Sequence, residues 1–241
     1  MALYTISDLH LPLGVNKPMD VFGPAWQNYV SRLGDNWNKT IKEDDTVVLP
    51  GDFSWGMRLE EAAADLQFVE ALPGRKILLR GNHDYWWATP AKMQRFFSEI
   101  GIKSIFLLQN NAFLYESRLT GQRCALCGSR FWQFPAGTQL GPEDHKIYLR
   151  ELARVQLSLQ AGAALEPDEI LFFSHYPPIL QGGVADAPFI ALMERYGVKH
   201  VIYGHIHGDA RNYAFTGTCQ DIRFDLVSCD FLQFMPLKLK D

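Results

Sequence analysis

Short apolar runs that end abruptly in polar residues are the clearest pattern along this chain. Five of them are rich in Val, Ile, Leu or Phe, at residues 3–7, 46–50, 76–80, 169–174 and 200–203. Runs of this length and composition predict buried β-strands. Each is followed by Asp, His or Asn, directly or after one glycine. The sequence therefore predicts that polar side chains gather where these strands end.

Longer stretches with apolar residues at helical spacing separate several of the runs. We expect helices at residues 26–37, 59–72, 90–100 and 142–164, and the last two begin with proline, which suits a first helical turn. Alternating strands and helices predict an α/β fold with some parallel pairing. In such sheets ligands bind beyond the carboxyl ends of the strands, so we expect the polar clusters in a single cleft.

Two parts of the chain lack the helical pattern. Residues 104–132 and residues 212–239 contain short strand-like runs without helices between them. Strands joined by short connections are usually antiparallel. We therefore expect these runs to form a second sheet, or the outer part of a mixed one, packed against the first.

Length and composition narrow the class of protein. The chain has 241 residues, 47% of them hydrophobic and 21% charged, which suits one globular domain over residues 1–241. A net charge of -4 argues against general nucleic-acid binding, which needs a basic face. The N-terminus lacks a secretion-signal pattern, and no apolar run reaches the ~18 residues of a membrane helix. We expect a cytoplasmic protein with neither nucleic acid nor membrane as a partner.

The residues that follow the strands are of types that bind metal ions. They are Asp, His and Asn without cysteine, a donor set that suits Mn, Fe, Zn, Co or Ni. His205 and His207 are separated by one residue at a strand end, where the chain bends, so each can reach a different ion. Asp8 and His10 have the same spacing, and a bend there can turn both toward one ion. Cys124 and Cys127 are expected on opposite faces of a strand, as buried thiols rather than a zinc or redox pair.

Five motifs, in order, resemble the signature of the calcineurin-like metallophosphoesterase superfamily. They are Asp8-Leu9-His10, Gly51-Asp52, Gly81-Asn82-His83-Asp84, His175, and Gly204-His205-Ile206-His207. Any one of them is weak, and His175 alone is better explained as a structural residue. Five in order, spread from residue 8 to residue 207, are specific. The resemblance implies one domain with an αββα sandwich of two mixed β-sheets flanked by helices.

The resemblance also implies a role for each motif residue. Two divalent or trivalent metal ions would be bound, the first by Asp8, His10 and His207 and the second by Asn82, His175 and His205, with Asp52 bridging both. His83 would lie beside the substrate as a catalytic acid, and Asp84 would hold its ring. None of these positions departs from the family pattern.

The same residues support a physical account of phosphoester hydrolysis. Two metal ions lower the pKa of a bridging water and bind phosphoryl oxygens. Asp8 and Asp52 neutralise only part of the metal charge, so the site stays attractive to an anion. The bridging hydroxide would attack phosphorus, and His83 would protonate the leaving oxygen. We expect hydrolysis of a small-molecule phosphomonoester or phosphodiester.

Several alternatives stay open at the level of sequence. Arg130 is a candidate substrate-binding residue, since arginine can donate two parallel hydrogen bonds to phosphate, or else a surface ion-pair partner. Trp86 and Trp87 can pack in the core or line the cleft. The whole protein can also be a non-catalytic metal-binding protein-interaction module of the same fold. A metal-dependent amide hydrolase would more typically begin with His-x-His than with Asp8-Leu9-His10.

Overall fold

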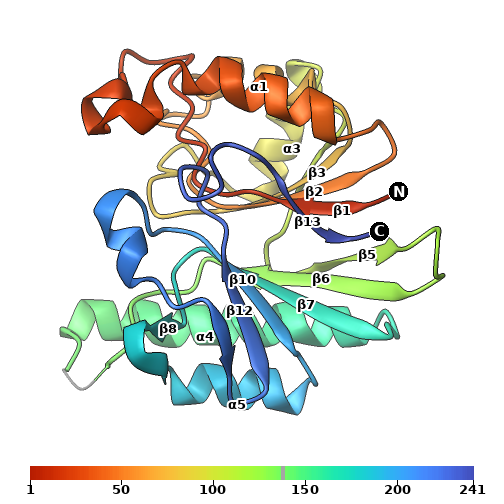
Figure 1. The fold of residues 1–241 in the computed structure, drawn as a ribbon, viewed down its shortest axis with the longest axis vertical. Helices are drawn as coiled ribbons and strands as arrows, with labels where there is room; N and C mark the ends of the chain where they lie inside the picture. The colour runs from red at the N-terminus through yellow and green to blue at the C-terminus, as the bar shows by residue number, and fades with distance from the viewer. Residues whose placement is uncertain (137–138) are drawn as a thin grey trace.

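Two large β-sheets packed face to face form the centre of the molecule (Figure 1). The computed structural model describes residues 1–136 and 139–241. The first sheet has the order β13 (Leu237–Lys240), β1 (Leu3–Thr5), β2 (Thr46–Pro50), β3 (Arg75–Leu79) and β4 (Ile105–Leu107). The second has the order β11 (Gly217–Cys219), β12 (Ile222–Leu226), β10 (His200–Tyr203), β7 (Glu169–Ser174), β6 (Arg123–Ser129) and β5 (Ala112–Glu116). A separate two-stranded sheet pairs β8 (Ile179–Leu180) with β9 (Val184–Ala185).

Helices cover the outer face of each sheet, which gives the four layers of an αββα sandwich (Figure 1). The first sheet is covered by α1 (Tyr29–Thr40), α2 (Ala63–Glu70) and α3 (Pro90–Glu99). The second is covered by α4 (Pro142–Ala163) and α5 (Ala187–Arg195). Short 3-10 turns occur at Asp20–Phe22, Pro24–Trp26, Gln181–Gly183 and Gly208–Tyr213. The mixed α/β fold expected from the sequence is confirmed.

The strand predictions were right in position and partly wrong in direction. All five apolar runs form strands: β1, β2, β3, β7 and β10. Of the runs expected to be antiparallel, β5 pairs so with β6, β11 with β12, and β13 with β1. On their other sides β6 and β12 pair in parallel with β7 and β10, and β4 pairs in parallel with β3. The reason for β6 is that α4 follows it and carries the chain back, so that β7 enters the sheet in the same direction.

The four expected helices are present, with shifted starts for two of them. The first begins at Tyr29 rather than at residue 26, because Pro24–Trp26 forms a 3-10 turn and Asn28 has a left-handed φ of 51°. Helix α5 was not predicted. Two residues at its start do mark it in the sequence. Asp186 caps it by accepting a hydrogen bond from the Phe189 amide, and a proline lies in its first turn.

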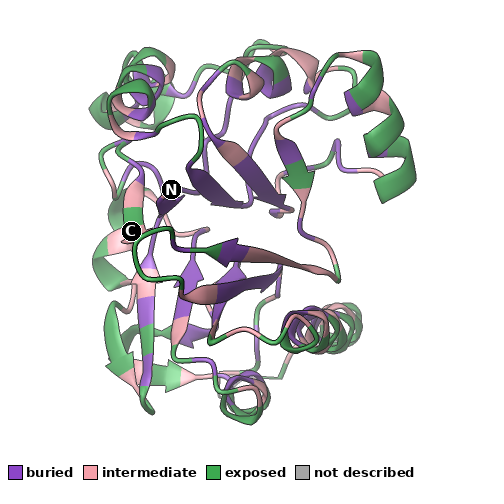
Figure 2. Ribbon diagram, turned by 90° about the vertical axis from the view of Figure 1, so that its right-hand side faces the viewer, coloured by how far each residue is buried: buried purple, intermediate pink, exposed green. Residues whose placement is uncertain are grey.

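The strands alternate between two apolar layers. In β2, Val47 and Leu49 face the helices whereas Val48 faces the other sheet. In β7, Phe172 packs on the helices and Phe173 packs between the sheets. Figure 2 shows the result, buried strands enclosed by helices with exposed outer faces. Because both faces of each sheet are covered, the central strands are continuous apolar runs.

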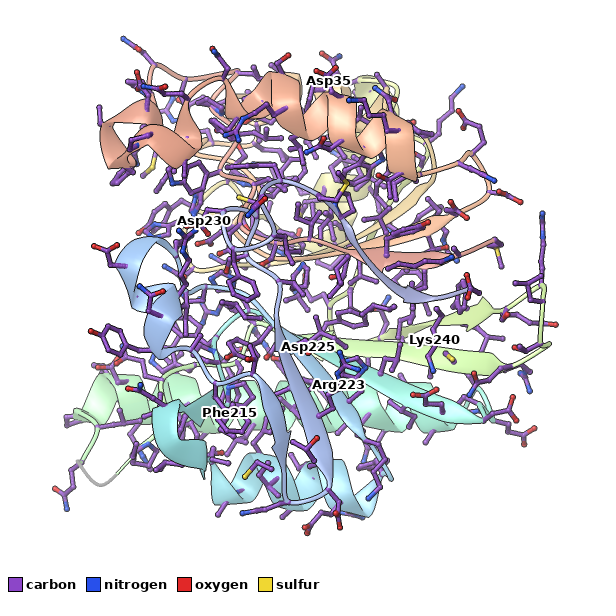
Figure 3. All side chains as sticks on the ribbon, viewed as in Figure 1. Asp35, Phe215, Arg223, Asp225, Asp230 and Lys240 are labelled. Atoms are coloured by element: carbon purple, nitrogen blue, oxygen red, sulfur yellow. The ribbon has the colours of Figure 1, made fainter. Side chains whose placement is uncertain are left out.

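Polar contacts at the edges tie the layers together. Lys240 of β13, labelled in Figure 3, forms an ion pair of 2.6 Å with Glu169 of β7, which joins the first sheet to the second. Cys124 and Cys127 are free and buried on opposite faces of β6, as expected. None of the described helices combines the length and apolar character needed to cross a lipid bilayer.

Candidate metal centre

Seven polar side chains from five strand ends lie together at one edge of the sandwich. They follow β1, β2 and β3 of the first sheet and β7 and β10 of the second. The seven are Asp8, His10, Asp52, Asn82, His175, His205 and His207. These are the residues singled out as ligands from the sequence. Both sheets therefore contribute to one site, although its residues span 200 positions of the chain.

The first group of possible ligands lies around the end of β1. Single ligand atoms of Asp8, His10, Asp52 and His207 all lie within 4.8 Å of one another. The Nε2 atoms of His10 and His207 are 3.1 Å apart. Two nitrogen ligands of one ion, each bound at about 2.0–2.1 Å, lie about 3.0–3.4 Å apart, so this spacing suits a shared ion.

The second group shares Asp52 with the first. Ligand atoms of Asp52, His175 and His205 also lie within 4.8 Å of one another. The Asn82 Oδ1 atom is 2.6 Å from His175 Nε2 and 2.9 Å from His205 Nδ1. Asn82 thus faces the same point as the two imidazoles. With Asp52 common to both groups, the arrangement suits two neighbouring cations with one carboxylate between them.

The backbone at the ligands is bent into an uncommon conformation. Asp8, His10, Asp52 and His205 all have left-handed φ angles, of 60°, 46°, 51° and 72°. Non-glycine residues rarely adopt this region, and such strain clusters at functional sites. The bend turns Asp8 and His10, which an extended chain would point to opposite faces, toward the same group.

Two glycines make room for the ligands. A Cβ atom at Gly81 would collide with Asp52, and one at Gly204 would collide with Ser7 and Asp8. Each glycine immediately precedes a candidate ligand, Asn82 or His205. The Gly-Asn and Gly-His pairs of the motifs therefore have a packing reason, the close approach of one strand end to the ligand of another.

The charges in the cluster are set by burial and by each other. Burial lowers the pKa of His10 and of His205 to about 3, so both rings are neutral, the form that binds metal. Burial alone would raise the pKa of Asp52, but His175 outweighs it and the carboxyl stays ionised. Burial opposes a charge on His175, yet Asp52, 3.4 Å away, raises its pKa to about 9. A cation bound there would displace that proton.

The donor set accommodates metal ions. Asp52 Oδ2 is buried and has no hydrogen-bond partner among the described residues. A buried charged acceptor without a partner is costly, and a cation would satisfy it. Imidazole, carboxylate and amide donors suit borderline ions such as Mn, Fe or Zn. The residues present therefore fit the two-metal centre inferred from the motifs.

His83 lies beside the cluster. Its amide donates to Asp52 Oδ1 at 2.8 Å, and its ring is 5.7 Å from the His10 ring and 4.9 Å from the Trp55 ring, centre to centre. Burial lowers the pKa of His83, although Asp52 opposes this. An imidazolium with a lowered pKa gives up its proton more readily, which suits a group next to a leaving oxygen.

Asp84 does not have the role expected from the sequence. Its carboxylate accepts hydrogen bonds from the amides of Phe53, Ser54 and Gly81 and from the Trp86 indole. No hydrogen bond joins it to the His83 ring within residues 1–136 and 139–241. Asp84 is fully buried, and it holds the loop after β2 against the loop after β3. It is therefore a residue that positions the main chain around Asp52 rather than the His83 ring.

The remaining candidates lie to one side of the cluster. Arg130 forms an ion pair, as one of the two alternatives from the sequence had it, but the side chain is only 12% exposed and the pair is not at the surface. Its guanidinium donates to Glu151 at 3.3 Å and lies 4.5 Å from the centre of the Trp132 ring. Trp86 and Trp87 are buried in the core under the helices, and Trp87 also lines a cavity beside the cluster.

Sequence patterns missed the aromatic walls of the site. Trp55 stacks on His10 with ring centres 4.5 Å apart, and Tyr176 lies 4.2 Å from His205. A cavity of about 290 Å³ next to the first group is lined by His10, Met19, Phe22, Trp26, Trp55, His83, His207 and Gly208. Tyr176 directly follows His175, and that adjacency was an available signal. Trp26 lies in no motif and is brought to the site only by the fold.

Comparison with known families agrees with this geometry. A family model described as calcineurin-like phosphoesterase matches residues 1–209. The Gene 66 protein of Mycobacterium phage L5 is 35% identical over 80 residues, which are 32% of this chain and 37% of that protein. The chain thus covers little more than a third of that relative.

Solved structures share the fold at low identity. Phosphopantetheinyl hydrolase (PptH) from Mycobacterium tuberculosis has a TM-score of 0.57 and 13% identity, over 99% of this chain and 95% of the other. The protein TT1561 of Thermus thermophilus has a TM-score of 0.58 and 11% identity, over 99% and 97%. The protein AQ665 from Aquifex aeolicus has a TM-score of 0.50 and 18% identity, over 98% and 95%. At these identities the likeness shows the fold alone.

Proposed function

The chain belongs to the calcineurin-like phosphoesterase family, and on that premise we propose that it hydrolyses a small-molecule phosphomonoester or phosphodiester with two bound metal ions. The observation that carries the proposal is the pair of ligand groups that share Asp52. A single-metal site would need only one of them. We also propose that residues 1–241 form a single catalytic domain.

The proposed ligand sets follow the geometry. Asp8, His10 and His207 would hold one ion, Asn82, His175 and His205 the other, and Asp52 both. When bound, the two ions would supply a nucleophile from water at neutral pH and positive charge for the phosphoryl oxygens. Asp8 and Asp52 are the only carboxylates in the two groups, so two dications would leave the site positive. That excess charge favours an anionic phosphoryl group.

The surrounding residues have separate tasks in this proposal. His83 would donate a proton or a hydrogen bond to the leaving oxygen. The aromatic cavity at Trp26 and Trp55 would exclude water from one side of the site and receive an apolar part of the ester. Asp84 would keep the loops that carry Asp52 and Asn82 together through its four hydrogen bonds.

The non-catalytic alternative keeps the same metal site but requires no proton donor. An intact His83, placed 5.7 Å from His10 and next to an open cavity, favours catalysis over a module that only binds. Hydrolysis itself separates the two. The protein loaded with Mn²⁺ is expected to hydrolyse p-nitrophenyl phosphate or bis(p-nitrophenyl) phosphate, and inactivity toward both with Mn, Fe, Zn, Co and Ni would favour the module.

Asp52→Asn tests the shared ligand directly. The substitution removes the negative charge common to both groups while preserving size, so kcat should fall on the order of 10³-fold or more. The variant should keep the circular-dichroism spectrum of the wild type. Asp35→Asn, at an exposed position of α1, is the control and should leave kcat unchanged. Near-wild-type turnover of Asp52→Asn would refute the bridging role.

A further inference from the structure

A second polar cavity lies beside the metal centre. Its volume is about 390 Å³, within the range of small-ligand pockets. Residues at the carboxyl ends of β3, β4 and β6 line it, with the loop before α3 and one face of α4. Its polar side chains include Arg80, Arg130, Arg154, Glu151 and Gln109. We call it the arginine pocket.

The arginine pocket holds more positive than negative charge. Glu151, with no exposed surface, accepts hydrogen bonds from Arg154 at 2.7 Å and from Arg130 at 3.3 Å, and Ser129 donates to its other oxygen at 3.1 Å. Three guanidiniums thus face one lining carboxylate, so positive charge is in excess among the side chains that line the pocket. Asp84 is the other acid that acts on Arg80, and its charge offsets part of this excess. Its oxygens accept from main-chain amides, and no ion pair joins it to Arg80 among the described residues.

Two of the three arginines have unused donors. The Nε atoms of Arg80 and Arg130 are buried and have no hydrogen-bond partner among the described residues. For Arg80, no ion pair or side-chain hydrogen bond is found among residues 1–136 and 139–241. Both side chains are partly buried, but a buried N–H donor without an acceptor is costly, and an acceptor that enters the pocket would complete it. Planar guanidiniums bind carboxylate and phosphate through two parallel hydrogen bonds, so an oxyanion is the matching acceptor.

The pocket and the metal centre are neighbours in both sheets. In the first sheet, Arg80 is two residues before the candidate ligand Asn82. In the second, Ser129 of β6 pairs in register with Ser174 of β7, so the next residues, Arg130 and His175, start from adjacent parallel strands. Adjacent strands lie about 4.8 Å apart. A small molecule bound at the metals can therefore reach the pocket.

We propose that the arginine pocket binds a second anionic group, a carboxylate or a phosphate, of the substrate whose phosphoester lies at the metals. The inference rests on the proposed function and narrows it, because an uncharged alcohol on the ester would leave Arg80 without a partner. The substrate is thus a phosphoester with at least two separate negative groups.

Inhibition by paired probes tests the proposal. The assay is inhibition of p-nitrophenyl phosphate hydrolysis by the Mn²⁺-loaded protein. It compares linear alkyl phosphonates of increasing length, which carry one anionic group, with ω-carboxyalkyl phosphonates and alkylene bisphosphonates, which carry a second. At the matching chain length a second anion should lower the inhibition constant about tenfold or more. The carboxylate and phosphonate series tell which anion fits. Equal constants at every length, with and without the second anion, would overturn the proposal.

The Arg80→Gln variant tests whether the arginine pocket causes the tighter inhibition by probes with a second anion. This substitution breaks no ion pair found among the described residues, and it should abolish the advantage of the second anion while leaving inhibition by the simple alkyl phosphonate unchanged. Arg95→Gln is the matched control: it removes the same charge at an exposed position of α3 that does not line the pocket, and should keep the advantage. A merely structural Arg80 would lower the melting temperature of the variant without changing the ratio of the two constants, and that result would refute the pocket.

The proposed function and this inference can fail separately. If the wild type hydrolyses p-nitrophenyl phosphate but shows no preference for a second anion, only the pocket proposal fails. If it hydrolyses nothing, the proposed function fails. Calorimetric titration with the same bisphosphonates then tests the pocket, through the difference in dissociation constant between the wild type and Arg80→Gln. A difference of about tenfold supports the pocket, and none overturns it.

Discussion

Asp52 has an unusual environment for a carboxylate. Its Oδ2 is buried without a hydrogen-bond donor among the described residues, 3.4 Å from His175 Nε2 and 3.7 Å from His10 Nε2. Its backbone is left-handed at φ 51°. A carboxylate kept ionised, strained and short of donors is poorly explained by stability alone. It is well explained as a group held ready for cations.

His83→Ala tests the acid at the residue scale. Turnover should fall about 10²- to 10⁴-fold for an ester with a poor leaving group such as phenol, because the leaving oxygen loses its proton donor. The loss should be smaller for nitrophenolate, which leaves without protonation. Kinetics on both esters measure the difference, with His145→Ala, at a position of α4 outside the motifs, as the control. An equal loss on both substrates would argue against proton donation.

At the scale of elements, helix α2 is anchored to the site through one carboxyl group. Asp65 accepts from the Leu13 amide at 2.8 Å and is hydrogen-bonded to the Ser54 hydroxyl. It thereby connects α2 to the segments that follow β1 and β2, which carry Asp8 and Asp52. Burial raises the pKa of Asp65 from 3.8 to about 6.

This raised pKa predicts the direction of a pH effect on stability. The folded protein binds the Asp65 proton more tightly than the unfolded chain does. The contribution of the protonated carboxyl to the free energy of unfolding is therefore full below pH ~4, and it is lost as pH rises through about 6. Asn at this position is always neutral and can still accept from Leu13. The stability of Asp65→Asn relative to wild type should therefore rise across that window, by up to about 3 kcal/mol.

Urea unfolding at pH values from about 4 to about 7 measures the difference between Asp65→Asn and the wild type. Asp35→Asn, at an exposed site, should show no such slope. A difference that stays constant across this range would show that Asp65 is not titrating as described.

The elements that were predicted best are those that a short stretch of neighbouring residues identifies. The strand ends that carry Asp8, Asp52, Asn82, His175 and His205 could be located because each apolar run stops at a ligand-type residue. Strand direction was less predictable, since the parallel pairing of β6 with β7 depends on the crossover through α4.

The surroundings of the ligands could not be predicted from the same signal. Arg130 forms an ion pair with Glu151, a residue of α4 that belongs to no motif. Trp26 and Trp55 reach the site from segments without any motif. Contacts between distant segments leave no pattern in a single sequence.

At the scale of the whole molecule, the cluster joins the two sheets. Asp8, Asp52 and Asn82 follow strands of the first sheet, and His175 and His205 follow strands of the second. Bound ions would therefore act as cross-links between the two halves of the sandwich. Ligands that bind only the folded state stabilise it by mass action.

Metal removal should consequently lower the melting temperature. An ion present at about 100 times its dissociation constant contributes about 2.7 kcal/mol per site, which corresponds to about 5–10 °C for a chain of this size. Calorimetry with Mn²⁺ and with a chelator measures the shift. His207→Ala should show a smaller shift, and an identical melting temperature with and without metal would contradict binding between the sheets.

The most direct measurement is the number of metal ions bound per chain. Protein stripped of metal, dialysed against Mn²⁺ and analysed by elemental mass spectrometry should contain two ions per chain. Asp52→Asn should retain fewer, and His207→Ala should retain about one. A wild-type protein that binds no ion, or an Asp52→Asn variant that still binds two, would contradict a centre in which one carboxylate serves both ions.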